Sequence, residues 1–311
     1  MAVRIIGIDL GGTEFRIGVL EVGSKGDLNL SGDVKELSSP RSWEEFTSFL
    51  KDHRKRAPKD VGGYAIAGAI EGHAKVTRAP SLPWLDRRDV PGELAPCLGL
   101  NPSEIVIAND MEVAACGEKA KGVLRKYEWA IFDTISTGWG GALILNGEVV
   151  AGEPGHVNLG LSLPYMCGCG NMGCVEALYS GSAMERRILH HLRSQDILFP
   201  SDLGDKVWEY FYKVLETEEG WAISLIEEWA EGVGRAWAKV LNHVKPIEAI
   251  VYMGTTAENL IPKVLPKIRT TMQRICMFPN HKELPIRRAA ERDRSLYGVA
   301  VVYRKVKERR Y

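Results

Sequence analysis

Two distant segments of this sequence share one pattern: an apolar run that ends at aspartate, a turn rich in glycine and threonine, and a second apolar run. The first copy spans residues 3–22 and carries Asp-Leu-Gly-Gly-Thr at 9–13. The second spans residues 129–145, where Asp133 is followed by a turn at 134–138. Each copy predicts two strands joined by a tight turn. One such hairpin in each half of the chain predicts two related α/β domains that face each other.

The rest of the chain is also typical of an α/β protein. Apolar residues at helical spacing predict helices, and short apolar runs between them predict buried strands. We expect helices near 42–56, 110–120, 182–193, 221–243, 260–272 and 295–307, strands near 61–67, 104–108 and 249–253, and a hairpin turn at Asn146-Gly147.

The charge balance argues against nucleic-acid and membrane partners. The 311 residues include 40 basic and 40 acidic side chains, so the formal net charge is zero. Proteins that bind nucleic acids or anionic membranes normally present a basic surface. A strand-like run begins at Val3, so we expect no signal peptide, and no apolar stretch approaches the ~20 residues that span a bilayer. A cytoplasmic location is therefore expected.

Three of the six cysteines, Cys167, Cys169 and Cys174, crowd together in the chain, and His156 precedes them. In a chain without a secretory signal, such a cluster favours metal ligation over disulfides. Three thiolates and one imidazole are typical of a closed tetrahedral zinc site, which is structural because no ligand position stays open. The alternative is reduced thiols in a glycine-rich loop. The remaining cysteines are predicted to be small core residues: Cys97, Cys116 and Cys276.

The two glycine-rich turns are candidate phosphate sites. In the first, the N–H groups of Gly11-Gly12 and the Thr13 hydroxyl would cradle phosphate, while Asp9 would hold magnesium directly or through water. Taken alone, these glycines equally suit a tight turn. No Gly-Lys-Ser/Thr sequence is present there, so this is not a Walker loop. The matching turn at Thr137-Gly138 favours the phosphate hypothesis, with a clamp built mainly from backbone groups.

Two sets of polar residues are candidates for substrate binding. Asn109-Asp110 falls where a predicted strand gives way to a predicted helix, so one interpretation is a helix N-cap. The functional alternative is an amide that orients a substrate beside a carboxylate base, as phosphoryl transfer to an alcohol requires. Glu153 and Glu176 flank the metal loop, so zinc binding would bring both near His156. They are either solvated acids or, because one loop anchors both, ligands of sugar hydroxyls.

Taken in chain order, these segments resemble the ROK family of sugar kinases and repressors. The resemblance runs from residue 3 to about residue 300, and the cysteine cluster with its trailing glutamate is its most specific part. The matching segments are Asp-Leu-Gly-Gly-Thr at 9–13, Asn-Asp at 109–110, Ser-Thr-Gly-Trp-Gly-Gly at 136–141, Gly-Glu-Pro-Gly-His at 152–156, Cys-Gly-Cys-Gly-Asn-Met-Gly-Cys-Val-Glu at 167–176 and Met-Gly at 253–254.

The resemblance implies the two-domain, actin-like (ribonuclease-H-type) α/β ATPase fold, with sugar and ATP in a cleft between the domains. We expect a small domain of residues 1–110 plus about 295–311, and a larger domain of residues 111–294 that carries the zinc loop at 156–174. The family resemblance also implies a homodimer.

The same resemblance implies roles for individual residues. Asp110 would be the general base, magnesium would bridge the ATP phosphates, and Gly254 would mark the adenosine side. His156 would both bind zinc and face the sugar, which couples the metal to substrate geometry. The residues that would hold sugar hydroxyls are Asn109, Glu153, His156 and Glu176.

The sequence departs from the family pattern at several positions. The sugar-side segment, usually close to Asn-Leu-Pro-Gly-Trp, reads Ser81-Leu82-Pro83-Trp84. The short Ser81 leaves room for a bulkier substituent unless neighbouring residues fill that space. The catalytic and zinc positions are intact, so we expect kinase activity. The other departures are Trp139 and Ala142 in the second phosphate turn, Pro154 before Gly-His, and Gly254-Thr255-Thr256 in place of a run of glycines.

We therefore expect an ATP-dependent kinase of a hexose, with glucose and its 6-hydroxyl as the first candidate acceptor. Amino sugars and N-acetylhexosamines are the alternative acceptors. A non-catalytic sugar-binding protein is the alternative function, although the joint presence of Asp9 and Asp110 favours catalysis. A repressor would need a helix-turn-helix domain before the first strand, and we expect none because that strand starts at residue 3.

Overall fold

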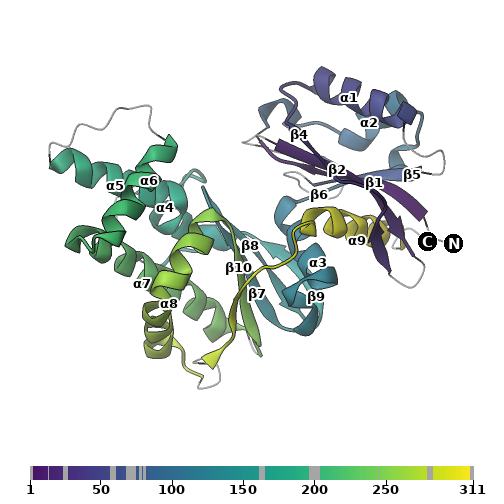
Figure 1. Ribbon diagram of the computed structural model, residues 1–311. Helices are drawn as coiled ribbons and strands as arrows, with labels where there is room; N and C mark the ends of the chain where they lie inside the picture. Colours follow the sequence, from purple (N-terminus) through teal and green to yellow (C-terminus); the bar gives the residue numbers. More distant parts are fainter. Residues whose placement is uncertain are drawn as a thin grey trace. The chain divides into compact units, whose positions relative to one another are not determined.

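A computed structural model describes residues 3–12, 14–23, 27–56, 61–67, 75–76, 79, 82–160, 165–195, 204–244, 246–278 and 283–308. The chain divides into two compact units, called here unit 1 (residues 1–126 and 290–311) and unit 2 (residues 127–289). Both contain a mixed β-sheet and helices, and each is described by itself (Figure 1).

The sheet of unit 1 is built on the predicted hairpin around the first glycine-rich turn. β1 (Val3–Leu10) pairs antiparallel with β2 (Glu14–Val22). β5 runs parallel to β1, and β6 runs parallel to β5. Among the described residues the strand order is β3-β2-β1-β5-β6, and β4 also pairs with β2. The remaining strands are β3 (Leu28–Leu30), β4 (Lys35–Ser38), β5 (Val61–Ala67) and β6 (Ile105–Ala108).

Helices cover both faces of this sheet (Figure 1). On one face, α1 (Trp43–Arg56) and α2 (Val90–Leu98) pack Phe46 and Leu94 in one core with Ile6 and Ile8 of β1. On the opposite face, Val299 of α9 lies over Gly7, because alternate residues of a strand point to opposite sides. The other helical segments of unit 1 are α3 (Asp110–Lys121), α9 (Arg294–Glu308) and the short turns η1 (Pro83–Leu85), η2 (Pro102–Glu104) and η3 (Val123–Lys126).

The sheet of unit 2 contains the second hairpin. β7 (Ala130–Ile135) pairs antiparallel with β8 (Trp139–Leu145), and β8 with β9 (Glu148–Gly152). The predicted turn at Asn146-Gly147 joins β8 to β9, with φ of 54° and 78°, which suits the twist of a two-residue hairpin. β10 (Ala249–Met253) runs parallel to β7 and to β11 (Ile286–Arg288).

The helices of unit 2 enclose one large apolar core. Trp229 and Trp237 of α7 are fully buried there, together with Phe211 of α6. Ile131 and Ile135 of β7 face the same core. The helical segments are η4 (Pro154–His156), α4 (Val175–Tyr179), α5 (Gly181–Ser194), α6 (Gly204–Glu216), α7 (Gly220–His243) and α8 (Thr255–Ile275).

The helices and buried strands predicted from periodicity are present at the expected positions. The structure adds α2, α4, α6 and the short strands β3, β4 and β11, and β9 follows the predicted hairpin turn. One detail of the predicted repeat is wrong: β7 does not end at Asp133 but continues to Ile135, so Asp133 lies inside the strand, opposite Gly141. Asp9, by contrast, is the second-last residue of β1, so the two aspartates are not equivalent.

The chain leaves unit 1 after Lys126 and returns at Ala290, whereas we expected these crossings near residues 110 and 295. The physical reason is the fully buried Glu118 of α3. Its carboxylate accepts hydrogen bonds from the N–H groups of Val123, Ala290 and Glu291, and Arg294 Nε lies 3.4 Å away. One side chain thus ties the outgoing and the returning segment to unit 1.

Replacing Glu118 with Gln should destabilise the protein. The amide presents a donor where the carboxylate accepted from N–H groups, so buried donors lose their partner at a cost of about 2 kcal/mol in unfolding free energy. Urea unfolding of E118Q and of the matched exposed variant E308Q would measure this. We expect E308Q to remain within about 0.5 kcal/mol of the parent; equal stability of E118Q and E308Q would contradict the proposed clamp.

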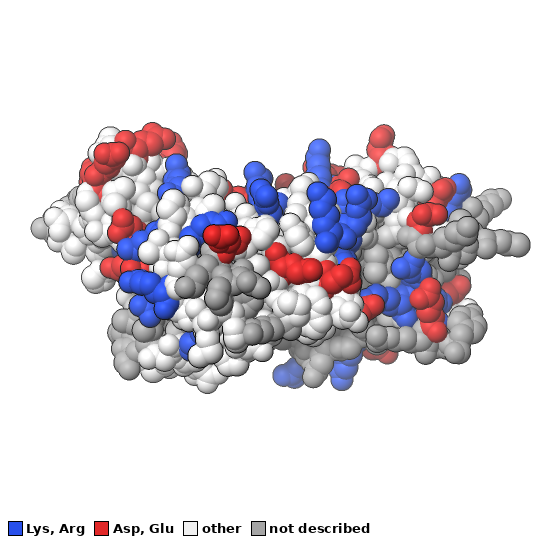
Figure 2. Space-filling view, turned by 90° about the horizontal axis from the view of Figure 1, so that it is seen from below, with Lys and Arg blue, Asp and Glu red and all other residues white. Residues whose placement is uncertain are grey.

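The surface carries charges of both signs. On the face drawn in Figure 2, basic and acidic side chains lie close to one another, in keeping with the zero net charge of the sequence. None of the helices in the described part of the chain is long and apolar enough to cross a membrane.

Candidate functional site

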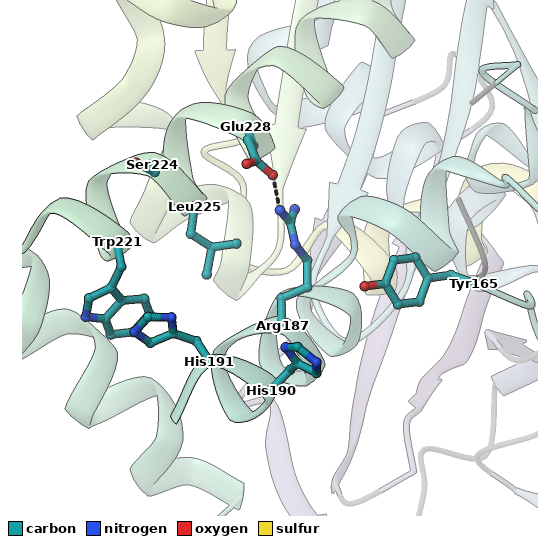
Figure 3. A pocket seen from close by; sticks show the side chains of 8 residues that line it. All are labelled: Tyr165, Arg187, His190, His191, Trp221, Ser224, Leu225 and Glu228. Atoms are coloured by element: carbon teal, nitrogen blue, oxygen red, sulfur yellow. Dashed lines mark hydrogen bonds and ion pairs between the residues drawn. The ribbon is translucent and has the colours of Figure 1, made fainter. Parts of the chain in front are cut away.

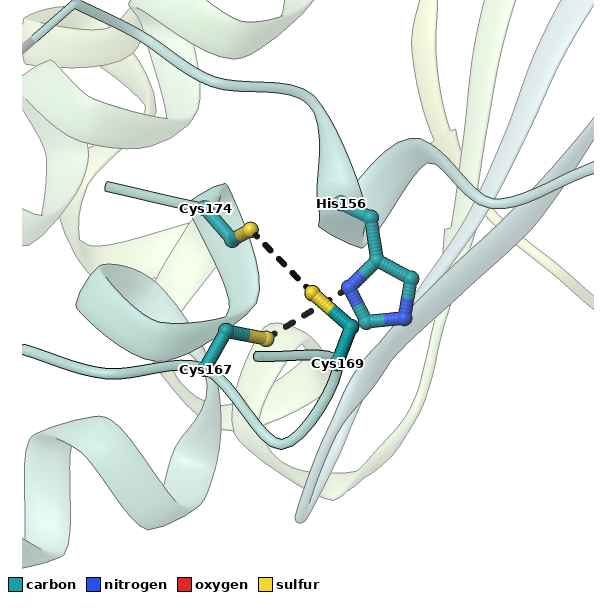
Figure 4. A group of neighbouring side chains, drawn as sticks. All are labelled: His156, Cys167, Cys169 and Cys174. Carbon is teal, nitrogen blue, oxygen red and sulfur yellow. Dashed lines mark hydrogen bonds between the residues drawn. The ribbon is translucent and has the colours of Figure 1, made fainter. Parts of the chain in front are cut away.

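The four predicted metal ligands lie together in unit 2 (Figure 4). His156 is the last residue of η4, and Cys167, Cys169 and Cys174 come from the loop that leads into α4. Their ligand atoms all lie within 4.8 Å of one another. The Cys169 and Cys174 Sγ atoms are 3.7 Å apart, and the Cys167 Sγ atom is 3.5 Å from His156 Nδ1.

These separations fit a zinc ion. Tetrahedral bonds of about 2.3 Å to sulfur and 2.0–2.1 Å to nitrogen place two sulfurs about 3.8 Å apart, and a sulfur and a nitrogen about 3.5 Å apart. Burial raises the pKa of the Cys174 thiol to about 12 and also raises the pKa of Cys167, whereas a hydrogen bond from the backbone of Asn171 lowers the pKa of Cys169. A bound divalent ion would favour the thiolates. The donor set and its spacing therefore suit a closed structural site.

Glu176 connects the metal loop to the phosphate turn of unit 2. Its Oε1 lies 3.8 Å from Cys167 Sγ, and its Oε2 accepts a hydrogen bond of 3.0 Å from the backbone N–H of Trp139. Glu153 precedes η4 and is exposed, as is His156. The loop thus brings three of the predicted sugar ligands, Glu153, His156 and Glu176, to one end of unit 2.

The second phosphate turn is held by its neighbours in unit 2. The N–H groups of Gly181 and Ser182, at the start of α5, donate to the carbonyls of Ser136 and Thr137. Gly254 caps α8 with a φ of 95°, and an added Cβ would lie 2.6 Å from the Ile135 carbonyl oxygen, so only glycine fits. The turn therefore lies beside the N-termini of two helices, where N–H groups and helix dipoles favour anions.

A pocket of about 350 Å³ opens next to this turn. Trp208 and Tyr212, on successive turns of α6, form an aromatic wall with ring centroids 5.7 Å apart. Burial raises the pKa of Tyr212, so its hydroxyl stays protonated at neutral pH. The remaining lining residues are Ser136, Thr137, Gly181, Ser182, Glu185, Thr255, Thr256 and Asn259.

The α6 residues of this pocket were not predicted from the sequence. The signal was present, because Val207, Phe211 and Val214 recur at helical spacing between residues 204 and 216. The same segment places Trp208 and Tyr212 four residues apart, on one face of a helix. Spacing alone did not show that this face borders a phosphate turn.

In unit 1, Asn109 and Asp110 begin α3. The Asn109 side-chain oxygen accepts from the N–H groups of Met111 and Glu112, so the predicted N-cap is confirmed. The cap uses only this oxygen, which leaves the Asn109 amide nitrogen as a donor. Asp110 as a whole residue is exposed to solvent. Its carboxyl group is nevertheless partly desolvated by its surroundings, and this desolvation raises its pKa.

Asp9 lies near Asp110 in the same unit. Burial raises the pKa of Asp9, and repulsion from Asp110 adds to that rise, whereas a hydrogen bond from Ser295 and the charge of Arg16 oppose it. Neighbouring carboxylates are chemically suited to share a hard divalent cation such as Mg²⁺. The first glycine-rich turn follows Asp9, and its Gly11 carbonyl accepts a 2.6 Å hydrogen bond from Ser39.

A further hollow of about 500 Å³ in unit 1 borders this turn at Gly12. It includes Leu82, Pro83 and Trp84 of the sugar-side segment. Two of the residues singled out from the sequence, Thr13 and Ser81, lie outside the described residues. The other lining residues are Ser38, Ser39, Pro40 and Arg41.

Asp133 is a buried acid that the sequence analysis did not single out as a site. It is 3% exposed and points into the apolar core of unit 2. Its Oδ2 accepts hydrogen bonds from the indole nitrogens of Trp139, at 3.2 Å, and Trp237, at 2.8 Å. Burial nevertheless raises the pKa of Asp133 to about 6, because two neutral donors offset only part of the desolvation.

A second pocket of unit 2, of about 270 Å³, lies between α5 and α7 (Figure 3). Two pairs of its lining residues contact each other: Arg187 forms an ion pair with Glu228, and the His191 ring stacks on Trp221 at 4.1 Å. The pocket beside the phosphate turn offers more polar groups, so it is the stronger nucleotide candidate.

Comparison with known proteins identifies relatives of the whole chain. The model of the ROK family matches residues 5–306. The N-acetylgalactosamine kinase AgaK of Shewanella sp. (strain ANA-3) is 30% identical over 199 residues, which are 58% of this chain and 62% of that protein. The glucokinase of Halalkalibacterium halodurans is 25% identical over 270 residues, 81% of this chain and 80% of that protein. The chain thus spans about three fifths of the length of the first relative.

The fold has a close counterpart among solved structures. The ROK hexokinase from Thermus thermophilus matches with a TM-score of 0.79 at 24% identity, over 98% of this chain and all of that one. At this identity the likeness shows the fold alone, and it confirms the predicted actin-like, two-domain α/β architecture.

Loss of one thiol should remove the metal and weaken the fold. We expect Cys169→Ser to lower zinc content and to lower the melting temperature by roughly 5 °C or more, since a structural ion contributes folding free energy. Metal analysis and calorimetry on the same preparation would measure both. Cys97→Ser, outside the cluster, is the control and should keep its zinc; a zinc-replete, fully stable Cys169→Ser protein would refute the site.

The buried carboxyl of Asp133 should make stability depend on pH. Its pKa rises from 3.8 to about 6 on folding, so the folded protein binds this proton more tightly and stability falls as pH increases through that window. At 1.36 kcal/mol per pH unit the loss is up to about 3 kcal/mol. Asp133→Asn lacks this loss, so its stability relative to the parent should increase between pH 4 and pH 7. Urea unfolding of both proteins across that range would test this, and parallel curves would contradict it.

Proposed function

The chain belongs to the ROK family, and we propose that it is an ATP-dependent sugar kinase. The observation that carries the proposal is the pocket beside the second phosphate turn, where an aromatic wall and two helix N-termini meet within unit 2. An adenine base can stack on such a wall while phosphates lie against backbone N–H groups. The names of the relatives, an N-acetylgalactosamine kinase and a glucokinase, support the same reaction.

In this proposal, unit 2 holds the nucleotide. The adenine lies against Trp208 and Tyr212, and Gly254 lets the start of α8 approach the nucleotide. The phosphates lie at Thr137-Gly138, next to the start of α5. Little covalent chemistry is asked of these groups, because phosphoryl transfer depends mainly on positioning and on stabilising negative charge.

Unit 1 supplies the base and the cation site. Asp110 takes the proton from the attacking sugar hydroxyl as that oxygen bonds to the γ-phosphorus and ADP leaves. The raised pKa of Asp110 makes its carboxylate a better proton acceptor than an ordinary aspartate. Magnesium, when bound, neutralises phosphate charge, and Asp9 is the residue placed to hold it directly or through water. The N–H groups of Gly11-Gly12 are proposed to contact the phosphates.

Zinc serves the reaction indirectly. The ion fixes the loop from which Glu153, His156 and Glu176 present their polar groups, and these side chains are proposed to bind sugar hydroxyls together with Asn109. Because Glu176 also accepts from the Trp139 N–H, the metal loop and the phosphate turn are mechanically linked. Zinc is thus proposed as a structural cofactor, with no open ligand position for an activated water.

The acceptor is proposed to be a hexose, with glucose at its 6-hydroxyl first. An amino sugar or N-acetylhexosamine is the second candidate, favoured by the roomy hollow beside Leu82-Pro83-Trp84 and by the first relative's name. We also propose a homodimer, which gel filtration with light scattering would test.

A coupled ADP-release assay tests the reaction and the acceptor together. ATP and magnesium would be supplied with glucose, mannose, glucosamine, N-acetylglucosamine, N-acetylgalactosamine and N-acetylmannosamine in turn. We expect sugar-dependent ADP release. The preferred sugar is the one with the highest kcat/KM in the panel. Silence across the panel from folded, zinc-loaded protein would refute the kinase and favour a sugar-binding role.

The base is tested by Asp110→Asn. Because the amide accepts no proton, kcat should fall about 10²- to 10⁴-fold, while calorimetry should still detect sugar binding. Glu112→Gln, two residues further along α3, is the matched control and should keep most of the activity. Near-normal turnover by Asp110→Asn would exclude it as the base.

A further inference from the structure

Stability alone does not account for the acid inside the core of unit 2. Asp133 shares one face of β7 with Ile131 and Ile135, and both of these pack in the apolar core. The two indole donors do not fully offset the desolvation of its carboxylate, as the raised pKa shows. An apolar side chain of similar size would fill this place at less cost. A costly buried acid that organises its neighbours is a candidate for a functional role.

What Asp133 organises is Trp139, the residue that ends the phosphate turn. The Trp139 indole is 3% exposed and is held by Asp133. The backbone of the same residue meets two parts of the proposed sugar site. Its N–H donates to Glu176, and its carbonyl lies so close to Gly155, between Glu153 and His156, that a side chain there would collide with it.

The two ends of the turn are fixed differently. The first end, Ser136 and Thr137, is held through its carbonyls by the start of α5. The far end, Gly138 and Trp139, is held by Glu176 and by the Trp139 indole. The indole is thus the side-chain anchor of that end, and Trp237 on α7 completes it by donating to the same Asp133 oxygen.

Two departures from the family pattern meet at this anchor. Trp139 is one, and Pro154 is the other. Gly141 pairs with Asp133 across the strands, and any side chain on Gly141 would collide with the Asp133 carboxylate and come within 2.9 Å of Pro154 Cγ. Asp133, Trp139, Gly141 and Pro154 therefore fit together as one packed group.

We propose that Asp133 is a positioning residue which, through the Trp139 indole, fixes the phosphate turn at residues 136–139 for phosphoryl transfer from ATP. The proposal rests on the proposed kinase activity for its consequence, but the anchoring itself is independent of activity. Asp133 touches neither substrate in this scheme. It acts by holding the N–H groups of the turn where they meet the phosphates, because small displacements of such groups slow the reaction strongly.

Amide hydrogen exchange on the whole protein tests the anchor. In Asp133→Leu and Trp237→Phe, the amides of Ser136 and Trp139, which donate to the Gly138 carbonyl and to Glu176, should exchange at least tenfold faster than in the parent. Asp133→Asn keeps a carbonyl acceptor for the indoles and should lie between the parent and Asp133→Leu. Trp229→Phe is the matched control: Trp229 is also fully buried on α7, but its indole donates to the Tyr179 carbonyl instead of Asp133.

Steady-state kinetics then test the consequence. We expect kcat/KM for ATP to fall at least tenfold in Asp133→Leu and Trp237→Phe, with zinc content unchanged and with Trp229→Phe near the parent. For Asp133→Asn we expect lower kcat/KM together with equal or higher stability at pH 7, a combination that a purely structural role would not produce. If Asp133→Leu does not fold, Asp133→Asn and Trp237→Phe still decide the test.

The outcomes separate the two proposals. Unchanged exchange at Ser136 and Trp139 in Trp237→Phe and Asp133→Asn overturns the anchor, whatever the activity. Faster exchange with parental kcat/KM overturns its role in the reaction. A parent protein without sugar-dependent turnover overturns the proposed function, while the exchange data still decide the anchor.

Discussion

The carboxylate of Glu118 is the interaction that joins the two chain segments of unit 1. The chain passes between the units twice, after residue 126 and before residue 290, and Glu118 holds both segments at unit 1. A buried acid is tolerated there because several N–H groups and a guanidinium satisfy it. The two segments are far apart in the sequence, and hydrogen bonds to Glu118 rather than a disulfide join them. Each unit can then keep a core of its own.

The metal loop and the phosphate turn of unit 2 form one continuous network. The cluster of His156 and three cysteines sets the position of the loop. Glu176 follows this loop and accepts a hydrogen bond from the Trp139 N–H, so it connects the loop to the turn. Trp139 in turn is fixed from the core by Asp133. The zinc ion that we propose would therefore influence the proposed reaction without offering an open ligand position, because it would order the groups around the sugar site.

The two buried acids, Glu118 and Asp133, illustrate different solutions to one problem. Glu118 is satisfied by backbone N–H groups and by Arg294, and it serves connectivity. Among the described residues, the donors to Asp133 are two indoles, which are neutral, so burial raises its pKa. The first is a structural clamp, and the second holds a functional turn at a cost in stability.

Much of this protein follows from the sequence alone. The spacing of His156 and the cysteines, the two strand–turn–strand units and the helical periodicity after residue 176 depend on local chemistry, so they predicted the metal cluster, both hairpins and the main helices. Short edge strands such as β3 and β11 have too few residues for a pattern, and α6 was missed although its apolar spacing was regular.

Only the tertiary structure decided that Trp208 and Tyr212 border the phosphate turn, that Glu118 holds the two crossings, and that Asp133 points into the core toward Trp139 and Trp237. The physical reason is that most of these contacts join residues from about 70 to more than 170 positions apart. The exceptions are the Asp133–Trp139 and Glu118–Val123 pairs, whose meaning depends on burial. Periodicity reports which face of a local element is apolar, but not which distant side chain it meets.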